Sequence, residues 1–173
     1  MAEQIMRLEA QVAQHDAQLA ELDQAISAGR AARGIAEQIF KHLDTAAGYG
    51  TWDMLGGGLL VDLAKHDELD AAQTLVERLQ VQLGRFKTEL ADVAINDELH
   101  VKIEGFMRFA DYFFDGLFAD WAVMDQIDTA KGQVRETQRQ IDTLLEKLAE
   151  DRGKKLQTRN AVEAQRNMLV DEA

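Results

Sequence analysis

The sequence predicts an all-α fold, in which a helical bundle head carries long antiparallel coiled-coil helices. The 173 residues contain no proline, the residue that most often interrupts a helix, so long unbroken helices are allowed. Apolar side chains recur every three and four residues over three long stretches, which is the spacing of helices packed along a left-handed seam. Alanine, glutamine, glutamate, leucine and arginine dominate both ends of the chain, as is typical of long helices.

Each of the three stretches places its regular residues at the a and d positions of a heptad. The first comprises Ile5, Leu8, Val12, His15, Leu19, Leu22 and Ile26. The second, which has no polar interruption, comprises Leu69, Ala72, Val76, Leu79, Leu83, Phe86, Leu90 and Val93. The third comprises Ile127, Ala130, Val134, Thr137, Ile141, Leu144 and Leu148. A strip of this kind needs other helices to shield it from water, and the second stretch is the strongest such signal.

These stretches predict three regions. Residues 1–47 form an N-terminal coiled-coil helix, 48–130 a glycine- and aromatic-rich helical core, and 131–173 a C-terminal coiled-coil helix. Gly153 predicts a break in the last helix, because glycine is common just after a helix end. Between residues 92 and 104 the apolar spacing changes to two, which suggests a short extended connector or hairpin.

The core region contains an internal repeat. Residues 58–72 align without gaps on residues 116–130, with seven identical positions of fifteen. Duplication and coincidence both account for this match, because shared helical periodicity inflates it. In each copy a pair of aspartates, Asp67 and Asp70 or Asp125 and Asp128, stands just before a heptad stretch. Aspartate at an N-cap or in a first turn favours the start of a helix there.

A site for a divalent metal is one hypothesis for the same repeat. Asp62 and His66 lie four residues apart, so a helix brings both to one face, and Asp120 of the second copy is a third possible ligand for a divalent metal. The alternative is structural: Asp62 and Asp120 fall on a positions, where a polar contact fixes helix register or the side chain lies exposed at a helix end. No other cofactor is indicated.

The core region also holds candidate packing or interaction residues. Gly56, Gly57 and Gly58 follow Trp52, and glycines inside a helix allow another backbone to approach closely. Seven of the eleven aromatic residues fall between 106 and 121, and their apolar side chains surround the predicted helix. An interior helix, a ligand pocket and an oligomer interface all fit this pattern. The residues singled out here are Phe113, Phe118 and Trp121.

The strings GTWDMLGGGLLVDLAKH and FADYFFDGLFADWAVMDQI carry a resemblance to a known group of proteins. They resemble segments of an uncharacterised family of bacterial helical, coiled-coil-bearing proteins, over about residues 45–130. The resemblance implies a bacterial cytosolic protein. It implies no activity and no catalytic residue.

Charge and composition narrow the function classes. The net charge of −12 disfavours nucleic acid and anionic membranes as partners and leaves basic proteins, cations or a second copy of the chain. The absence of cysteine excludes disulfides and thiolate chemistry. No signal peptide is recognisable, so a cytoplasmic protein is expected. We predict a structural or protein-interaction protein that self-associates as a homodimer or other homo-oligomer through its helices. The alternative is a metal- or small-ligand-binding bundle, and no catalytic residue is assigned.

Overall fold

The computed structural model contains four helices and no strand in the residues that it describes, which are 1–53, 58–93, 97–117 and 127–172. Side chains at 50–65, 97, 98 and 112–117 lie outside the description as well. The helices are α1 (Ala2–Asp53), α2 (Gly58–Asp92), α3 (Asp97–Leu117) and α4 (Ile127–Asp171). The all-α bundle predicted from the sequence is therefore confirmed.

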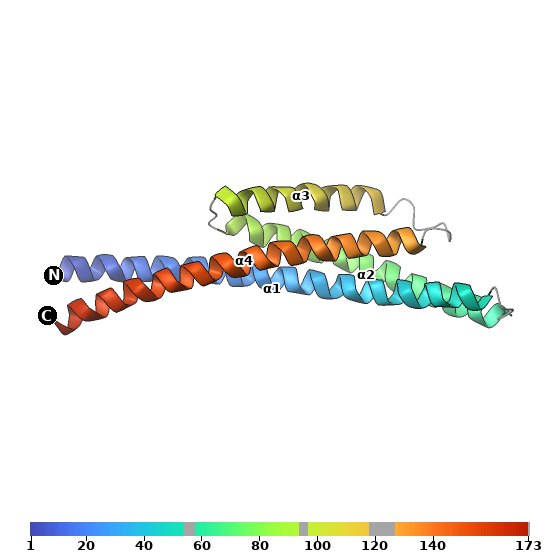
Figure 1. Cartoon of the computed structure of the whole chain (residues 1–173), viewed down its shortest axis with the longest axis horizontal. Coiled ribbons are helices and arrows are strands. Elements are labelled where there is room, and N and C mark those ends of the chain that lie inside the picture. The colour runs from blue at the N-terminus through green and yellow to red at the C-terminus, as the bar shows by residue number, and fades with distance from the viewer. Residues whose placement is uncertain (54–57, 94–96, 118–126, 173) are drawn as a thin grey trace.

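The molecule is elongated, and α1 runs along most of its length (Figure 1). Helices α2 and α4 both run antiparallel to α1 and pack against it, while α3 lies against α4 and α2. The N- and C-terminal ends of the chain lie together at one end of the molecule (Figure 1). At that end only α1 and α4 are present among the described elements, because α2 and α3 stop short of it.

The register between α1 and α4 is constant over four heptads. Asp16 contacts Arg159, Asp23 contacts Arg152 and Asp44 contacts Lys131, so the two residue numbers of every pair add to the same total. In these three pairs, the α1 residue and the α4 residue each occupy the e position of the heptad. In antiparallel helices that pack through a and d, the e positions of the two helices face each other. The ion pairs therefore flank the apolar seam and mark its alignment.

The heptad strip of α2 is buried along its length. Ala72, Val76, Leu79 and every later member are buried, and Leu69 is half-buried against the same core. Residues of α1 cover this strip, and the Gln82 side chain donates a hydrogen bond to the Ala28 carbonyl across the contact. The prediction that other helices shield this strip is confirmed.

The four helices meet most closely around the Phe86 ring of α2. This ring is fully buried, and its centroid lies 5.2 Å from that of Phe106 on α3. On α1 the same place is occupied by Gly29, where a Cβ atom would lie 2.8 Å from Phe86 Cζ and 2.8 Å from Leu145 Cδ2 of α4. Any side chain larger than hydrogen at residue 29 would collide with these neighbours. The glycine is what allows α1 to approach both α2 and α4 at this level.

The extended connector predicted between residues 92 and 104 is wrong, because α3 begins at Asp97. Leu99, Ile103 and Phe106 are buried, whereas Val101 is 62% exposed. The buried residues are therefore spaced by four and three, as on one face of a helix, and Val101 only imitated a period of two.

The break predicted near Gly153 is also wrong, because α4 continues unbroken from Ile127 to Asp171. Glycine in a helix interior lowers the stability of the helix by only about 1 kcal/mol relative to alanine. Packing against another helix can outweigh this loss. Next to this glycine, Arg152 binds Asp23 of α1, and Lys154 pairs with Glu150 one turn earlier. Contacts with α1 and within α4 thus hold the helix through Gly153.

The two aspartate pairs of the repeat were predicted to start helices, and the structure differs between them. Asp67 and Asp70 lie well inside α2, which already begins at Gly58, so they do not start that helix. Asp128 lies in the first turn of α4, as predicted, where a carboxylate favours the positive end of the helix dipole. Asp125 lies outside the described residues.

None of the described helices has a stretch that is both long enough and apolar enough to span a bilayer.

Candidate interaction surface

The predicted metal ligands are not brought together within the described residues. The backbone places Asp62 and His66 one turn apart on α2, and the His66 side chain is exposed. The Asp62 side chain and all of Asp120 lie outside the described residues. Within the described part of the chain, no three histidine or carboxylate side chains are placed to hold a metal ion. The metal site stays an untested prediction.

The side chains of the predicted packing residues also lie outside the description. Trp52 lies in the last turn of α1, Gly58 is the first residue of α2 and Phe113 lies in α3, but their surroundings are not described. Gly56, Gly57, Phe118 and Trp121 lie outside the described residues. The described surface that stands out is instead at the end where α1 and α4 pair without α2 and α3.

We call this end the distal arm and define it as residues 1–19 together with residues 156–171. Its inner strip on α1 is apolar: Leu8, Val12 and Leu19 are 6%, 7% and 8% exposed, against 0% for Ile39 in the middle of the bundle. These three residues stand apart from the main core, which begins at Leu22. The described residues of α4 beyond Asp151 include no buried side chain. The arm is therefore sealed less tightly than the bundle.

The side chains of α4 that face this strip include several basic ones. From Arg152 onward eight residues of α4 are half-buried, and four of them are arginine or lysine: Arg152, Gly153, Lys155, Arg159, Val162, Glu163, Arg166 and Leu169. Long basic side chains cover apolar surface with their aliphatic stems while the charged head stays in water. Lys155 occupies an a position, where the heptad pattern would require a leucine-type side chain, whereas Arg152, Arg159 and Arg166 occupy e positions beside the seam.

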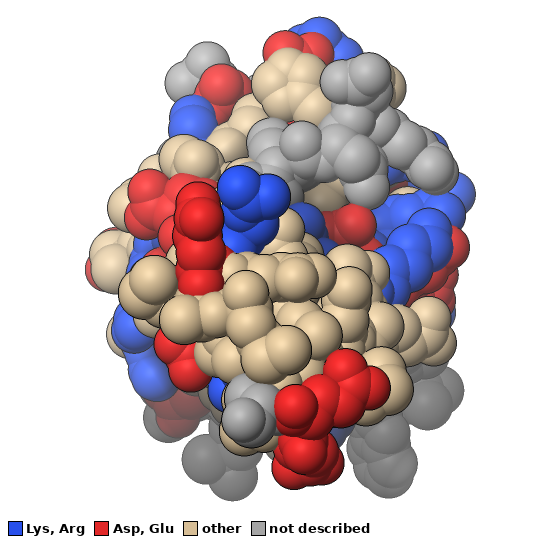
Figure 2. Space-filling view, turned by 90° about the vertical axis from the view of Figure 1, so that its left-hand side faces the viewer, with Lys and Arg blue, Asp and Glu red and all other residues tan. Residues whose placement is uncertain are grey.

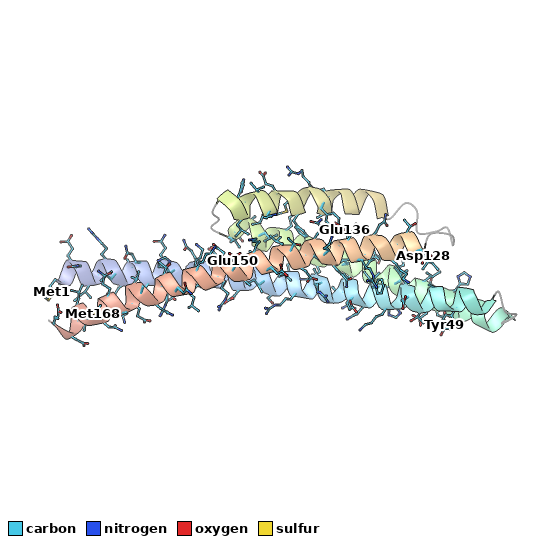
Figure 3. All side chains as sticks on the ribbon, viewed as in Figure 1. Met1, Tyr49, Asp128, Glu136, Glu150 and Met168 are labelled. Carbon is cyan, nitrogen blue, oxygen red and sulfur yellow. The ribbon has the colours of Figure 1, made fainter. Side chains whose placement is uncertain are left out.

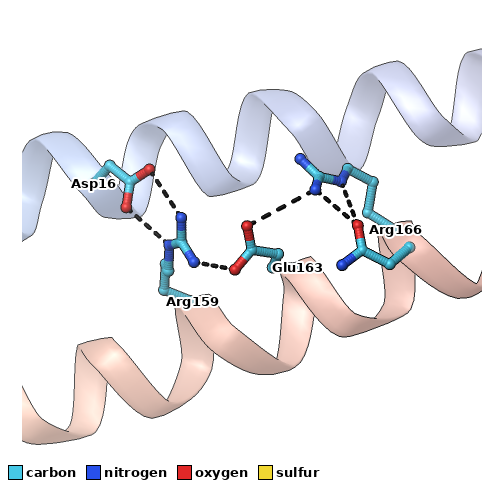
Figure 4. Close-up of polar contacts among 5 residues, drawn as sticks. Asp16, Arg159, Glu163 and Arg166 are labelled. Carbon is cyan, nitrogen blue, oxygen red and sulfur yellow. Dashed lines mark hydrogen bonds and ion pairs between the residues drawn. The ribbon is translucent and has the colours of Figure 1, made fainter.

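The charged heads of these arginines are held by acids on both helices (Figure 4). Arg159 donates from Nε to Asp16 Oδ1 at 2.9 Å and also contacts Glu163, one turn further along α4. Glu163 in turn pairs with Arg166 at 3.7 Å, and Arg166 donates to the Asn167 side chain. The arm is thus joined by a charge network, which salt screens more readily than it screens apolar contacts.

His15 interrupts the apolar strip of the arm on the α1 side. Its Nδ1 atom is buried and makes no hydrogen bond with any group that the structure describes. A buried polar atom without a partner costs free energy, whereas Thr137 in the third heptad stretch avoids this cost by donating to the Gln133 carbonyl at 2.9 Å. The seam is consequently weaker in the arm than around Thr137.

Ion pairs between α1 and α4 change the ionisation of their members. The hydrogen bond from Arg152 holds the pKa of Asp23 below its ordinary value of 3.8, although partial burial of the carboxylate opposes this shift. The hydrogen bond from Lys131 does the same to the pKa of Asp44. Hydrogen bonding to Asp16 raises the pKa of Arg159. Each of these shifts favours the charged form of the group whose pKa is shifted.

Exposed apolar side chains gather on the distal arm. Seven large apolar residues are exposed in the described structure, and five of them belong to the arm: Met1, Met6, Leu156, Met168 and Val170. Met1 and Met168 lie at the same end of the molecule, on neighbouring helices (Figure 3). Seen end-on, this part of the surface is mostly uncharged, with acidic and basic side chains around it (Figure 2). Exposed apolar surface of this kind is available to be covered by a partner.

Comparison with protein-family models, with curated proteins and with solved structures found no match for this chain. The assignment of the surface therefore rests on the chemistry of its own residues.

The distal arm is not apparent from the spacing of apolar residues alone. A signal was present in the charged ones. Asp16, Asp23 and Asp44 recur at multiples of seven residues along α1, and basic residues recur at the same interval along α4. Matching the two series in opposite directions would have identified α1 and α4 as partners and revealed their register.

The α1–α4 pairing is expected to weaken in acid. Folding lowers the pKa values of Asp23 and Asp44 from their ordinary value of 3.8. The two carboxylates therefore contribute their full share of folding stability above pH 3.8, and this share is lost as the pH falls through their folded pKa values. Thermal unfolding followed by circular dichroism between neutral pH and pH 3 should show a steeper acid loss for the wild type than for Asp23→Asn.

Glu9→Gln is the matched control for this measurement. Glu9 occupies the same heptad position on α1 but makes no ion pair with a described side chain. Its acid response should follow the wild type. Equal acid responses of wild type and Asp23→Asn would contradict the role given to the Asp23–Arg152 pair.

Proposed function

We propose that this chain is a structural or protein-interaction protein that self-associates through its coiled-coil helices, with two distal arms packing against each other in a homodimer. One observation carries the proposal: the arm concentrates the exposed apolar side chains of the described structure on a helix pair that is incompletely sealed. No catalytic role is proposed.

The physical argument concerns what a two-helix arm lacks. A pair of helices buries one seam and leaves the edges of that seam open to water, whereas four helices close around a common core. Packing two arms together would cover the parts of Leu8 and Val12 that remain exposed, and also the exposed side chains of Met6 and Leu156. Symmetric pairing of like surfaces is the commonest form of self-association in soluble proteins. A basic protein partner is the other candidate that the overall charge of −12 suggests.

The arms offer mixed charges to each other. Residues 1–19 carry Glu3, Glu9 and Asp16 but only one base, Arg7, whereas residues 156–171 carry two bases and two acids. Two arms related by a twofold axis that places α1 of one copy beside α4 of the other therefore avoid bringing the two acidic α1 segments together. Complementary potentials of this kind favour one orientation over others.

Sedimentation velocity of the full chain across the micromolar range tests the proposal. We expect a monomer–dimer equilibrium, and we expect the double variant Met6→Glu, Met168→Glu to raise the dissociation constant at least about tenfold, because each dimer would bury four new carboxylates. The two methionines are 61% and 60% exposed, so the monomer fold should tolerate both changes.

Val81→Glu is the matched control. Val81 is 76% exposed on α2, far along the chain from the arm, and gains the same charge. This variant should associate like the wild type. A chain that stays monomeric at every concentration, or a Val81→Glu variant that associates as weakly as the double variant, would remove the proposal.

A further inference from the structure

A second surface with the features of a binding site lies between α3 and α4, away from the distal arm. Nine described residues line a groove of about 360 Å³, which is within the usual size range of small-molecule sites. Phe106, Phe109 and Leu144 supply apolar and aromatic surface. Contacts between α3 and α4 are few, whereas α1 contacts α2 and α4 extensively.

The charges around the groove are opposite to those of the chain as a whole. Acids outnumber bases by 31 to 19 in the sequence, yet none of the nine lining residues is acidic and two are cationic, Lys102 and Arg108. Both cations are exposed, and neither forms an ion pair with a side chain that the structure describes. They stand on the same helix, three residues before and three residues after Gly105, so they flank the middle of the groove.

Gly105 keeps the centre of the groove open. No atom lies within 4 Å of the position that a Cβ would take at this residue. Glycine here is not required by close helix packing, in contrast to Gly29, and it weakens α3 relative to alanine. The space in front of it is bounded by the Phe106 and Phe109 rings and by the two cationic side chains.

We propose that this groove binds a small amphiphilic carboxylate. The apolar tail would lie against Phe109, Leu144 and Val101, and the carboxylate would bind Arg108, with Lys102 supplying a second positive charge. A guanidinium matches a carboxylate through two parallel hydrogen bonds, and Phe106, Phe109 and Leu144 give the groove apolar surface beside its polar side chains. The proposal does not depend on self-association, because the groove and the distal arm share no residue.

Titration calorimetry of the full chain with decanoate, below its micelle concentration, tests the proposal. We expect saturable binding that is at least about tenfold tighter than binding of decanol, which has the same tail without the charge. In the double variant Lys102→Gln, Arg108→Gln this preference should fall to about twofold or less, because a charge-assisted hydrogen bond and a second charge are lost.

Gly105→Leu blocks the groove without crowding the fold, since the new side chain enters open space and leucine favours helix more than glycine. Decanoate affinity should fall at least about tenfold in this variant. Gly153→Leu is the matched control, because this glycine also faces open space inside a long helix, and it should bind decanoate like the wild type.

Three results would overturn the proposal. The first is equal affinity for decanoate and decanol in the wild type. The second is decanoate binding that survives Gly105→Leu, or that Gly153→Leu weakens to the same degree. The third is a Gly105→Leu variant that loses self-association in sedimentation without any change in decanoate binding, which would make the groove a contact between copies of the chain.

Discussion

Replacing Phe86 with alanine is expected to lower the free energy of unfolding by about 3–5 kcal/mol. The Phe86 ring is fully buried where all four helices meet, and it stacks at a tilt of 60° on Phe106. Alanine would leave a cavity between Gly29 of α1 and Leu145 of α4, which cannot close without moving whole helices. Both the lost burial and the cavity contribute to the cost.

Chemical denaturation followed by circular dichroism measures this change, and Val81→Ala serves as its control. Val81 lies on the same helix but is 76% exposed, so its truncation should change the unfolding free energy by no more than about 0.5 kcal/mol. A loss for Phe86→Ala of the same size as that of Val81→Ala would show that the four helices do not meet at this ring.

Gly29→Leu is expected to destabilise the chain by about 1–3 kcal/mol or more, through overpacking instead of cavity formation. A Cβ atom at residue 29 would already lie 2.8 Å from both Phe86 Cζ and Leu145 Cδ2. The remaining atoms of leucine would push α1 away from α2 and α4. Thermal and chemical unfolding should both show the loss, even though leucine has the higher helix propensity.

Gly34→Leu tests whether the effect at residue 29 is one of space. Gly34 lies five residues further along α1 and has no atom within 4 Å of its Cβ position, so leucine there should stabilise the helix by up to about 1 kcal/mol. The Gly29→Ala, Phe86→Leu double variant should lose less stability than the two single changes added together, because the shorter side chain makes room for the new Cβ. Strict additivity would show that the two residues do not share this space.

Two predictions from the sequence were wrong for the same physical reason. Leu99, Val101 and Ile103 alternate with polar residues, which is typical of a strand, yet a helix buries Leu99 and Ile103 and exposes Val101. Gly153 is typical of a helix end, yet packing against α1 carries α4 through it. In both cases a short local pattern was outweighed by contacts with residues that are distant in sequence.

The importance of Gly29 could not be predicted from the sequence. Continuing the first heptad stretch from Ile26 puts Gly29 on the seam and Gly34 off it, but the heptad does not tell how closely another helix approaches either glycine. Their difference appears only when α2 and α4 are placed beside α1, because a glycine is required where another helix approaches closely and is merely tolerated elsewhere. The groove beside Gly105 was likewise not predictable, since it depends on how α3 lies against α4.

The sequence by itself determined the all-α class, the long helices and the buried face of α2, because helical periodicity is a local property that no tertiary contact needs to supply. It also contains the acids of α1 and the bases of α4 that recur at heptad intervals and pair with one another. Only the tertiary structure decided that the apolar strips of α1, α2 and α4 are covered within one chain, and that the distal arm is left as a two-helix pair. The reason is that a heptad strip specifies that it must be covered, but the connections and contact distances of the whole chain decide which helix covers it.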